Sequence, residues 1–238
     1  MTFFSPDKIF VVGSGGTGGR LIPVLAQVLA YHSSTQSSNL LVIDGDDYED
    51  KNITRQIVPP SHIGKNKAHS MKEFCEYQGL NNVESLDDFI SASTLTPLLR
   101  NSTCPLVVAC VDNDATRLAI INAISNVCSD KNFFFITPGN SDGLEEVRGQ
   151  VLWWGRLDGI TYGMNPIIAF PNLSNPQDSI PHKGSCALQA PSRPQLISAN
   201  LKAASCTLEV IQNHLDGKLS PEQSGIYFNI RNMKTSVS

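Results

Sequence analysis

The chain has 238 residues, which is enough for one α/β domain with a substantial core. Its formal net charge of −4 argues against binding to a nucleic-acid backbone, which requires a basic face. No apolar run approaches the roughly 20 residues of a transmembrane helix, and the first residues lack the basic and apolar regions of a signal peptide, so we expect a cytoplasmic protein without a membrane partner.

The first half of the chain alternates short apolar runs with helical patterns. Residues 9–13 predict a strand and residues 18–31 a helix, and a second buried strand at 39–44 ends on the carboxylate of Asp44. Residues 44–63 have no clear period and predict a long loop or a short irregular helix. Further patterns predict helices at 64–78, 93–99 and 114–128, and strands at 83–86, 105–111 and 132–137.

The second half begins with two further predicted strands, at 149–154 and 159–162. A proline-rich stretch at 164–194 then predicts an ordered but irregular crossover, and a long helix at 192–215 and a strand at 225–230 follow it. Strands that alternate with helices imply an α/β fold. We predict a Rossmann-like, doubly wound, mostly parallel sheet with a few antiparallel strands added in the C-terminal part.

A glycine-rich loop follows the first predicted strand. Residues 8–20 are KIFVVGSGGTGGR, and Gly13, Gly15 and Gly18 satisfy the G-x-G-x-x-G pattern. Backbone N–H groups at a helix start can bind an anion where no Cβ blocks the approach. On its own the loop favours a nicotinamide or flavin dinucleotide, with Asp44 holding a ribose. A turn that only packs a helix onto the sheet is the plainer alternative.

The charged residues that follow favour a triphosphate instead. Arg55 offers a planar fork for phosphate oxygens, and Lys65 and Lys67 add mobile positive charge near the same end of the sheet. Asp112 ends a predicted strand just before Asn113, so its carboxylate is placed to hold Mg²⁺ near the phosphates. The ordinary alternatives are a surface ion pair for Arg55, a solvated helix start for the lysines and a helix N-cap for Asp112.

In this order the motifs resemble the ThiF/MoeB/HesA superfamily, the bacterial relatives of ubiquitin-activating enzymes. The chain is similar to its compact bacterial or mobile-element members. The matching segments are Gly13-Ser-Gly15-Gly16-Thr-Gly18-Gly19, Asp44-Gly-Asp46, Asn52-Ile-Thr-Arg55-Gln56, Gly64-Lys-Asn-Lys67 and Cys110-Val-Asp112-Asn113. Gly16 and Gly19 are additional to the dinucleotide pattern, and both have places in the family pattern.

The resemblance implies ATP and magnesium as cofactors, and adenylation of the C-terminal carboxylate of a small ubiquitin-like or sulfur-carrier protein that ends in Gly-Gly. It implies a homodimer and a single adenylation domain, 1–238, in which 1–140 bind the nucleotide and 141–238 supply the crossover, the long helix and the carrier-binding strands. By position, the implied nucleotide-binding residues are Gly13, Gly15, Gly16, Gly18, Asp44, Asp46, Asn52, Arg55, Gln56, Lys67 and Asn113. The implied catalytic residues are Arg55, Lys67, Asp112 and Cys186, with Asp112 as the magnesium ligand.

The six cysteines form no C-x-x-C pair, so the chain lacks the paired zinc knuckles of many family members and we expect no zinc. Cys186 lies in the proline-rich crossover, in the segment where members keep a reactive cysteine. Its thiol is either a nucleophile that takes the acyl group from the adenylate or a small buried apolar side chain. The other five cysteines lie in helical or strand patterns and are expected in the core.

The remaining ring side chains carry no motif. Four histidines lack ligand-like spacing and are predicted at the surface, namely His32, His62, His69 and His214. Of Trp153 and Trp154, one is predicted to face the core.

Two functions of other classes remain as alternatives to adenylation. One is a catalytically silent nucleotide-binding partner subunit, and the other is an NAD-dependent oxidoreductase. A silent subunit is expected to have lost Arg55, Lys67 or Asp112, all of which this chain keeps.

Overall fold

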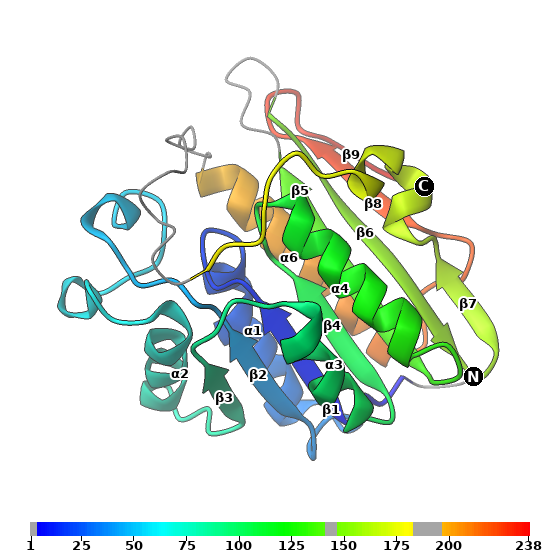
Figure 1. Cartoon of the computed structure of the whole chain (residues 1–238), viewed down its shortest axis with the longest axis horizontal. Coiled ribbons are helices and arrows are strands. Elements are labelled where there is room, and N and C mark those ends of the chain that lie inside the picture. The colour runs from blue at the N-terminus through cyan, green and yellow to red at the C-terminus, as the bar shows by residue number, and fades with distance from the viewer. Residues whose placement is uncertain (1–3, 141–146, 183–196) are drawn as a thin grey trace.

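The computed structural model describes residues 4–140, 147–182 and 197–238, and within them nine strands form one sheet (Figure 1). Its centre is β1 (Lys8–Val12), which pairs in parallel with β2 (Asn39–Ile43) on one side and β4 (Pro105–Ala109) on the other. The parallel part is completed by β3 (Val83–Leu86) beside β2 and β5 (Phe133–Asn140) beside β4. The predicted doubly wound parallel sheet is therefore confirmed.

The antiparallel strands gather at the C-terminal edge of the sheet, as predicted. The long strand β6 (Arg148–Leu157) runs antiparallel to β5 and also pairs with β7 (Ile160–Gly163) and β8 (Gly225–Asn229). A last strand, β9 (Lys234–Val237), pairs with β8 and was not predicted. Every residue of β9 is exposed, so its sequence carries no burial pattern that could reveal a strand.

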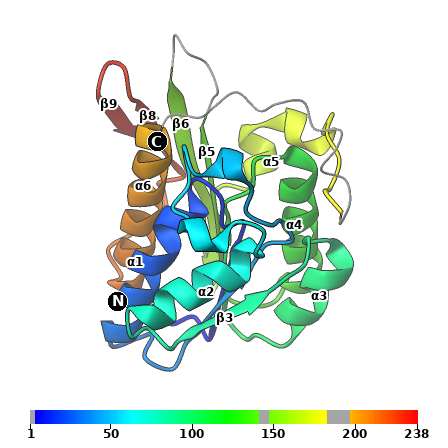
Figure 2. The same ribbon diagram turned by 90° about the vertical axis from the view of Figure 1, so that its left-hand side faces the viewer.

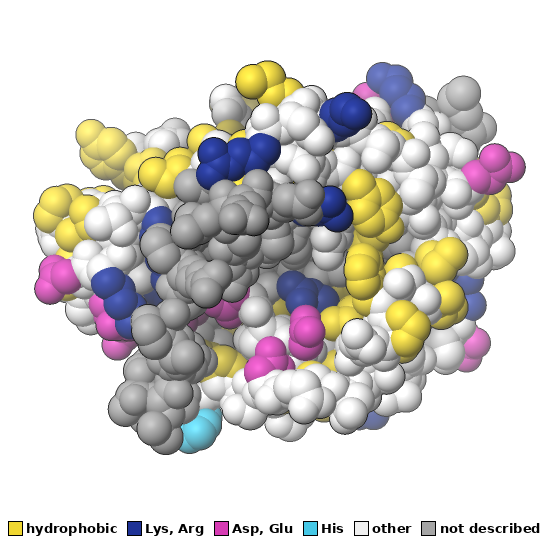
Figure 3. Space-filling model, turned by 90° about the horizontal axis from the view of Figure 1, so that it is seen from above, with side chains coloured by type: hydrophobic (Ala, Val, Ile, Leu, Met, Phe, Trp, Pro, Cys, Tyr) yellow, Lys and Arg dark blue, Asp and Glu magenta, His cyan; other side chains and the backbone are white. Residues whose placement is uncertain are grey.

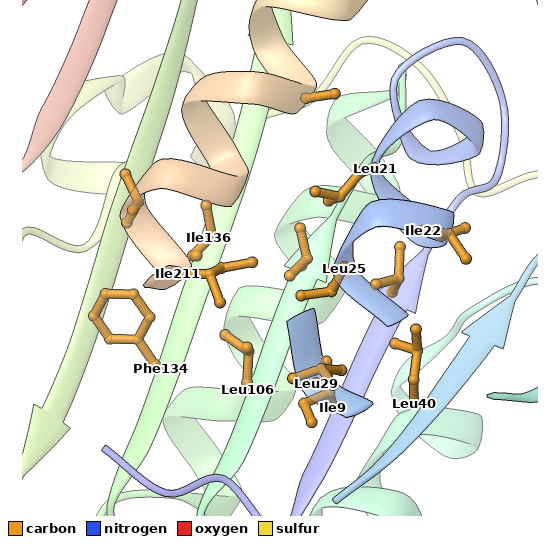
Figure 4. Close-up of a cluster of buried hydrophobic side chains, with 14 of the residues drawn as sticks. Ile9, Leu21, Ile22, Leu25, Leu29, Leu40, Leu106, Phe134, Ile136 and Ile211 are labelled. Carbon is orange, nitrogen blue, oxygen red and sulfur yellow. The ribbon is translucent and has the colours of Figure 1, made fainter. Parts of the chain in front are cut away.

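Helices cover both faces of the sheet (Figure 2). One face carries α1 (Gly18–Tyr31), α2 (Lys67–Tyr77) and α6 (Ile197–Leu215), and the other carries α3 (Ala92–Arg100) and α4 (Asp114–Val127). The strands alternate accordingly, because successive side chains point to opposite faces. Ile9 and Val11 join the core under α1, whereas Phe10 and Val12 join the core under α4. Figure 4 shows Leu21, Leu25 and Leu29 of α1 in the first of these cores.

The two long connections whose sequences show no regular hydrophobic period contain short helical turns. The loop after β2 holds two 3₁₀ turns, η1 (Asp50–Asn52) and η2 (Pro60–His62), and the stretch after β7 holds α5 (Pro166–Ala169) and η3 (Pro171–Ser174). Helix α2 begins three residues later than predicted, because Asn66 caps it by accepting a hydrogen bond from the His69 N–H at 3.1 Å. Cys186 and the predicted start of α6 at 192 lie outside the described residues. No helix of the described chain is both long and apolar enough to cross a bilayer.

The prediction for the tryptophans is confirmed, whereas that for His214 is wrong. Trp153 is buried, and the half-buried Trp154 meets the Phe133 ring edge-on at 4.8 Å between centroids. His214 lies on the buried side of α6, with its ring centroid 4.0 Å from that of Phe134 and 4.4 Å from that of Phe4. Burial lowers the pKa of His214 to about 3, so the folded protein holds a neutral imidazole.

We expect His214 to make the fold sensitive to mild acid. Its folded pKa lies below the unfolded value of 6.5, so the unfolded chain takes up the proton first and stability falls as the pH drops from about 6.5 toward 3. In urea unfolding, His214→Leu should reduce the loss of unfolding free energy between pH 7 and pH 5 by about 2 kcal/mol. The exposed His69→Leu serves as the matched control, and an equal pH dependence in both variants would contradict this account.

Candidate functional site

A cavity of about 960 Å³ opens at the carboxyl ends of β1, β2 and β4. The chain leaves β1 into α1 on one face of the sheet and leaves β4 into α4 on the other, so the cavity lies at the point where the winding of the sheet reverses. Figure 3 looks onto this end of the molecule, and acidic and basic side chains lie around a hollow near its centre.

The glycine loop forms one wall of this cavity, and its glycines have different structural reasons. Gly13 has φ +90°, and a Cβ there would lie 2.6 Å from the carbonyl oxygen of Cys110. A Cβ on Gly18 would collide with the carbonyl oxygen of Gly13. Gly15 is different, because its Cβ would meet only the Gln56 amide at 3.6 Å. Gly13 and Gly18 therefore shape the turn, whereas Gly15 borders open space in the cavity.

The backbone N–H groups of this loop are left available. Gly13 donates to the Ile43 carbonyl at 2.8 Å, and Ser14 donates to the Asp44 carboxylate at 2.7 Å. The next four N–H groups, those of residues 15–18, donate to no described residue. Successive free N–H groups at the start of a helix form an anion site, because the helix dipole adds positive potential there.

Asp44 connects the second strand to the glycine loop. One carboxylate oxygen accepts hydrogen bonds from the Ser14 N–H and from the Ser14 hydroxyl at 2.9 Å, and the other accepts from the Asp46 N–H at 3.0 Å. Burial raises the pKa of the Asp44 carboxyl, with Lys67 and the two N–H groups opposing this and the Asp46 charge adding to it. Asp44 thus lines the cavity and also fixes the start of the loop.

Lys67 is a buried cation surrounded by acids. Its side chain is 10% exposed, and its Nζ donates to a carboxylate oxygen of Asp46 at 3.0 Å. Burial lowers the pKa of Lys67, but the charges of Asp44, Asp46 and Asp112 raise it to a net value above the usual one. Lys67 therefore stays charged and offsets the repulsion between the acids at this end of the sheet.

Among the described residues that line the cavity, Arg55 is the cation without a partner. Three other cationic side chains line the cavity and are paired: Lys51 with Glu49, Lys67 with Asp46, and Arg117 with Asp114. The Arg55 guanidinium makes no hydrogen bond or ion pair with any described residue. An unpaired guanidinium beside free N–H groups is suited to bind phosphate oxygens.

Asp112 offers a free carboxylate on the same cavity. The residue is exposed, and its carboxylate forms no hydrogen bond within the described part of the chain. The N-cap of α4 is its neighbour Asn113, whose Oδ1 accepts from the Thr116 N–H at 2.7 Å. The alternative N-cap role for Asp112 is therefore wrong, and its carboxylate remains available to a ligand.

The other predicted residues of the 44–56 segment also reach the cavity. Asn52 is buried, and its Oδ1 accepts from the Glu49 N–H at 2.9 Å, which closes η1. The buried Oε1 of Gln56 has no hydrogen-bond donor in the described chain, although its amide lies over Gly15. The structure thus brings together all the predicted nucleotide-binding residues except Gly18, which packs behind the loop.

Arg117 is a residue that the sequence motifs did not reveal. Its Nε donates to the Thr137 hydroxyl and its Nη2 to the Val111 carbonyl, both at 2.8 Å, so it ties the end of β4 to β5. The only sequence sign is its spacing of three from Asp114, with which it forms an ion pair at 2.6 Å.

Another set of residues that line the cavity carries no charge, and we call it the uncharged wall. The β5–β6 end contributes small and amide side chains, and the segment after β7 contributes mostly apolar ones. These lining residues are Gly139, Asn140, Gln150 and Leu152, with Phe170, Asn172, Leu173 and Pro181.

A family model described as the ThiF family matches residues 4–154. The chain belongs to the ThiF family. No curated protein matches the sequence. The matched region of this ThiF-family protein contains the glycine loop, Arg55, Lys67 and Asp112, but not α6.

Two solved structures show the fold that this ThiF-family protein shares with others. Selenomethionine-labelled PaaA is 20% identical, with a TM-score of 0.64 over 98% of this chain and 72% of PaaA. MccB from E. coli with ATP is 17% identical, with a TM-score of 0.65 over 99% of this chain. The match covers 64% of MccB, so the chain spans just under two thirds of that protein's length.

Loss of the buried cation should destabilise the fold. Lys67→Met removes the counter-charge of Asp44 and Asp46, so we expect the unfolding free energy at pH 7 to fall by about 2 kcal/mol. Lys65→Met breaks only the exposed pair with Glu73 and should cost less than about 1 kcal/mol. Urea unfolding measures both values, and equal losses would show that Lys67 does not balance buried charge.

Proposed function

We propose that this protein uses ATP to adenylate the C-terminal carboxylate of a small protein or peptide. The observation that carries the proposal is a set of groups on one cavity that have no partner in the described chain: the N–H groups of Gly15, Gly16 and Thr17, the guanidinium of Arg55 and the carboxylate of Asp112. A dinucleotide requires only the loop and a ribose acid. The additional unpaired cation and carboxylate suit a triphosphate with its metal ion.

The residues would act by positioning and by neutralising charge. The attacking group is the carboxylate of the partner, which displaces pyrophosphate from the α-phosphate, so the protein needs no strong nucleophile for this step. Loop N–H groups and Arg55 would hold the phosphate oxygens as negative charge spreads over them. Asp44 would hold the ribose, and Lys67 keeps the acids compatible with a bound anion.

A magnesium ion fits the residues present. Among the described residues no three acidic, histidine or cysteine side chains form a metal cluster, but Mg²⁺ bound to ATP needs only one or two carboxylates besides phosphate oxygens and water. Asp112 would supply that carboxylate. When bound, the ion would neutralise charge on the phosphates.

The uncharged wall of the cavity is suited to the tail of the partner. Its amide and apolar side chains offer no charge to an ionic side chain, so it favours an uncharged extended tail such as Gly-Gly. Among the fold relatives, MccB has been solved with the peptide MccA, which supports a peptide or small protein partner. We propose a ubiquitin-like or sulfur-carrier protein as the partner, and one adenylation domain over 1–238 that acts as a homodimer.

Exchange of pyrophosphate into ATP, measured with the partner present, tests this function. Arg55→Ala and Asp112→Ala should each lower the exchange rate by about 100-fold, because each removes stabilisation of spreading phosphate charge. Lys72→Ala, at an exposed ion pair with Glu76 on α2, should leave the rate unchanged. ATP binding without exchange would support a silent subunit instead, and binding of NAD in preference to ATP would support an oxidoreductase.

Transfer of the acyl group to a cysteine would be a separate step. Cys110 lines the cavity, but burial raises the pKa of its thiol to about 12, and burial also raises the pKa of the other described cysteines. A thiol is a nucleophile only as the thiolate, so these five are unsuited to accept an acyl group. We therefore retain Cys186 as the proposed acceptor.

Cys186→Ala should separate the two steps. We expect it to keep pyrophosphate exchange within about twofold of the unmodified protein, since the carboxylate attacks the phosphate directly, and to abolish any thioester with the partner. Thioester is measured as a reducible conjugate on non-reducing gels, with Cys206→Ala as the control at a buried cysteine. Loss of exchange in Cys186→Ala would overturn this division of roles.

A further inference from the structure

Three distant segments meet behind the glycine loop at one buried amide. Asn200 of α6 is fully buried, and its Oδ1 accepts hydrogen bonds from the Thr17 hydroxyl at 3.2 Å and from the Asn140 amide at 2.8 Å. Asn200 does not line the cavity, whereas Thr17 and Asn140 both do. This amide therefore joins the glycine loop to the end of β5 from outside the cavity.

The other end of the Asn200 amide faces Gly16. A Cβ on Gly16 would collide with Nδ2 of Asn200, so only glycine allows α6 to approach the loop this closely. Nδ2 itself has no hydrogen-bond partner among the described residues. A buried NH2 group without a partner costs roughly 1–3 kcal/mol, which offsets the stabilisation from the two hydrogen bonds that Oδ1 accepts. Stability alone therefore does not explain an asparagine here.

The contacts of Thr17 and Gly16 explain what this arrangement maintains. Thr17 is the N-cap of α1, yet its side chain makes no capping bond, because its hydroxyl is directed to Asn200. The N–H groups that such a cap would bind donate instead to backbone carbonyls, that of Gly19 to Gly15 at 2.9 Å and that of Arg20 to Thr17 at 3.1 Å. The Gly16 carbonyl accepts a hydrogen bond from Arg20 Nη1 at 2.6 Å. The Gly16 C=O and the Thr17 N–H belong to the same trans peptide group, in which the two bonds point in opposite directions. Because the C=O points toward Arg20, the Thr17 N–H points away from it. Arg20 does not line the cavity, whereas Thr17 does.

We propose that Asn200 is a positioning residue that holds the Gly16–Thr17 turn with its N–H groups open to the phosphates of the nucleotide. The proposal rests on the proposed function in one respect, since it takes the anion to be ATP. It does not place Asn200 in contact with the nucleotide. Asn200 acts through the backbone of the loop, and it links the ordering of the loop to the position of α6.

A double-mutant cycle on ATP affinity tests this role. Gly16→Ala puts a methyl group where Asn200 Nδ2 lies and should weaken ATP binding by about tenfold. Asn200→Ser shortens the side chain and makes room, so in that background Gly16→Ala should weaken binding by less than about threefold. Gly15→Ala is the matched control, because a Cβ there does not meet Asn200, and it should weaken binding by the same factor in both backgrounds.

Calorimetry measures the ATP affinities, and thermal unfolding without nucleotide shows whether each variant folds. If Asn200→Ser does not fold, Asn200→Ala, which also removes Nδ2, replaces it in the cycle, and Gly16→Ala is again expected to weaken binding by less than about threefold in that background. Equal costs of Gly16→Ala in the unmodified and Asn200→Ser proteins would overturn the proposal, as would a coupling seen in Tm but not in affinity. Coupled ATP binding without pyrophosphate exchange would overturn the proposed function alone, and absence of ATP binding by the unmodified protein would overturn both.

Discussion

The backbone N–H groups of residues 15–18 have no partner within the described chain, and the rest of the site depends on this constraint. Such groups remain free only when the loop that carries them is fixed by other means. Asp44 fixes Ser14, the close approach of Gly13 to Gly18 fixes the turn, and Asn200 lies against Gly16. None of these contacts uses the N–H groups of residues 15–18, so these N–H groups remain available to an anion.

Two cations near this loop have different tasks. Lys67 is buried and bonded to Asp46, so its charge balances the acids at the ends of β2 and β4. Arg55 has no partner in the described chain, so its charge is available to a ligand. The same division applies to Asn113 and Asp112, where Asn113 caps α4 and Asp112 remains free. In both pairs, the first residue makes the bonds that hold the fold, and the side chain of the other is left without a bond in the described chain. Electrostatic stabilisation of a transferring phosphate requires charged groups that are available in this way.

Local patterns in the sequence were sufficient for the individual strands other than β9, the glycine loop and the charged segment after β2, because each is encoded within about 20 consecutive residues. Features that depend on contacts between distant segments were not predictable. The close approach of Asn200 depends on Gly16, and the burial of His214 depends on Phe4 and Phe134. Neither asparagine nor histidine on a helix signals its own burial. The exposed strand β9 was not predicted for the opposite reason. Its backbone pairs with β8, and this pairing requires no apolar side chains that a sequence pattern could reveal.

The central claim is that the loop binds a triphosphate which is cleaved at its α-phosphate. The most direct measurement is ³¹P NMR of the phosphate products formed from ATP when the protein acts on a small carrier protein that ends in Gly-Gly. The account predicts pyrophosphate and AMP or its acyl derivative, and no ADP, because the carboxylate attacks the α-phosphate. Formation of ADP and inorganic phosphate would place the cleavage at the γ-phosphate and would contradict the account.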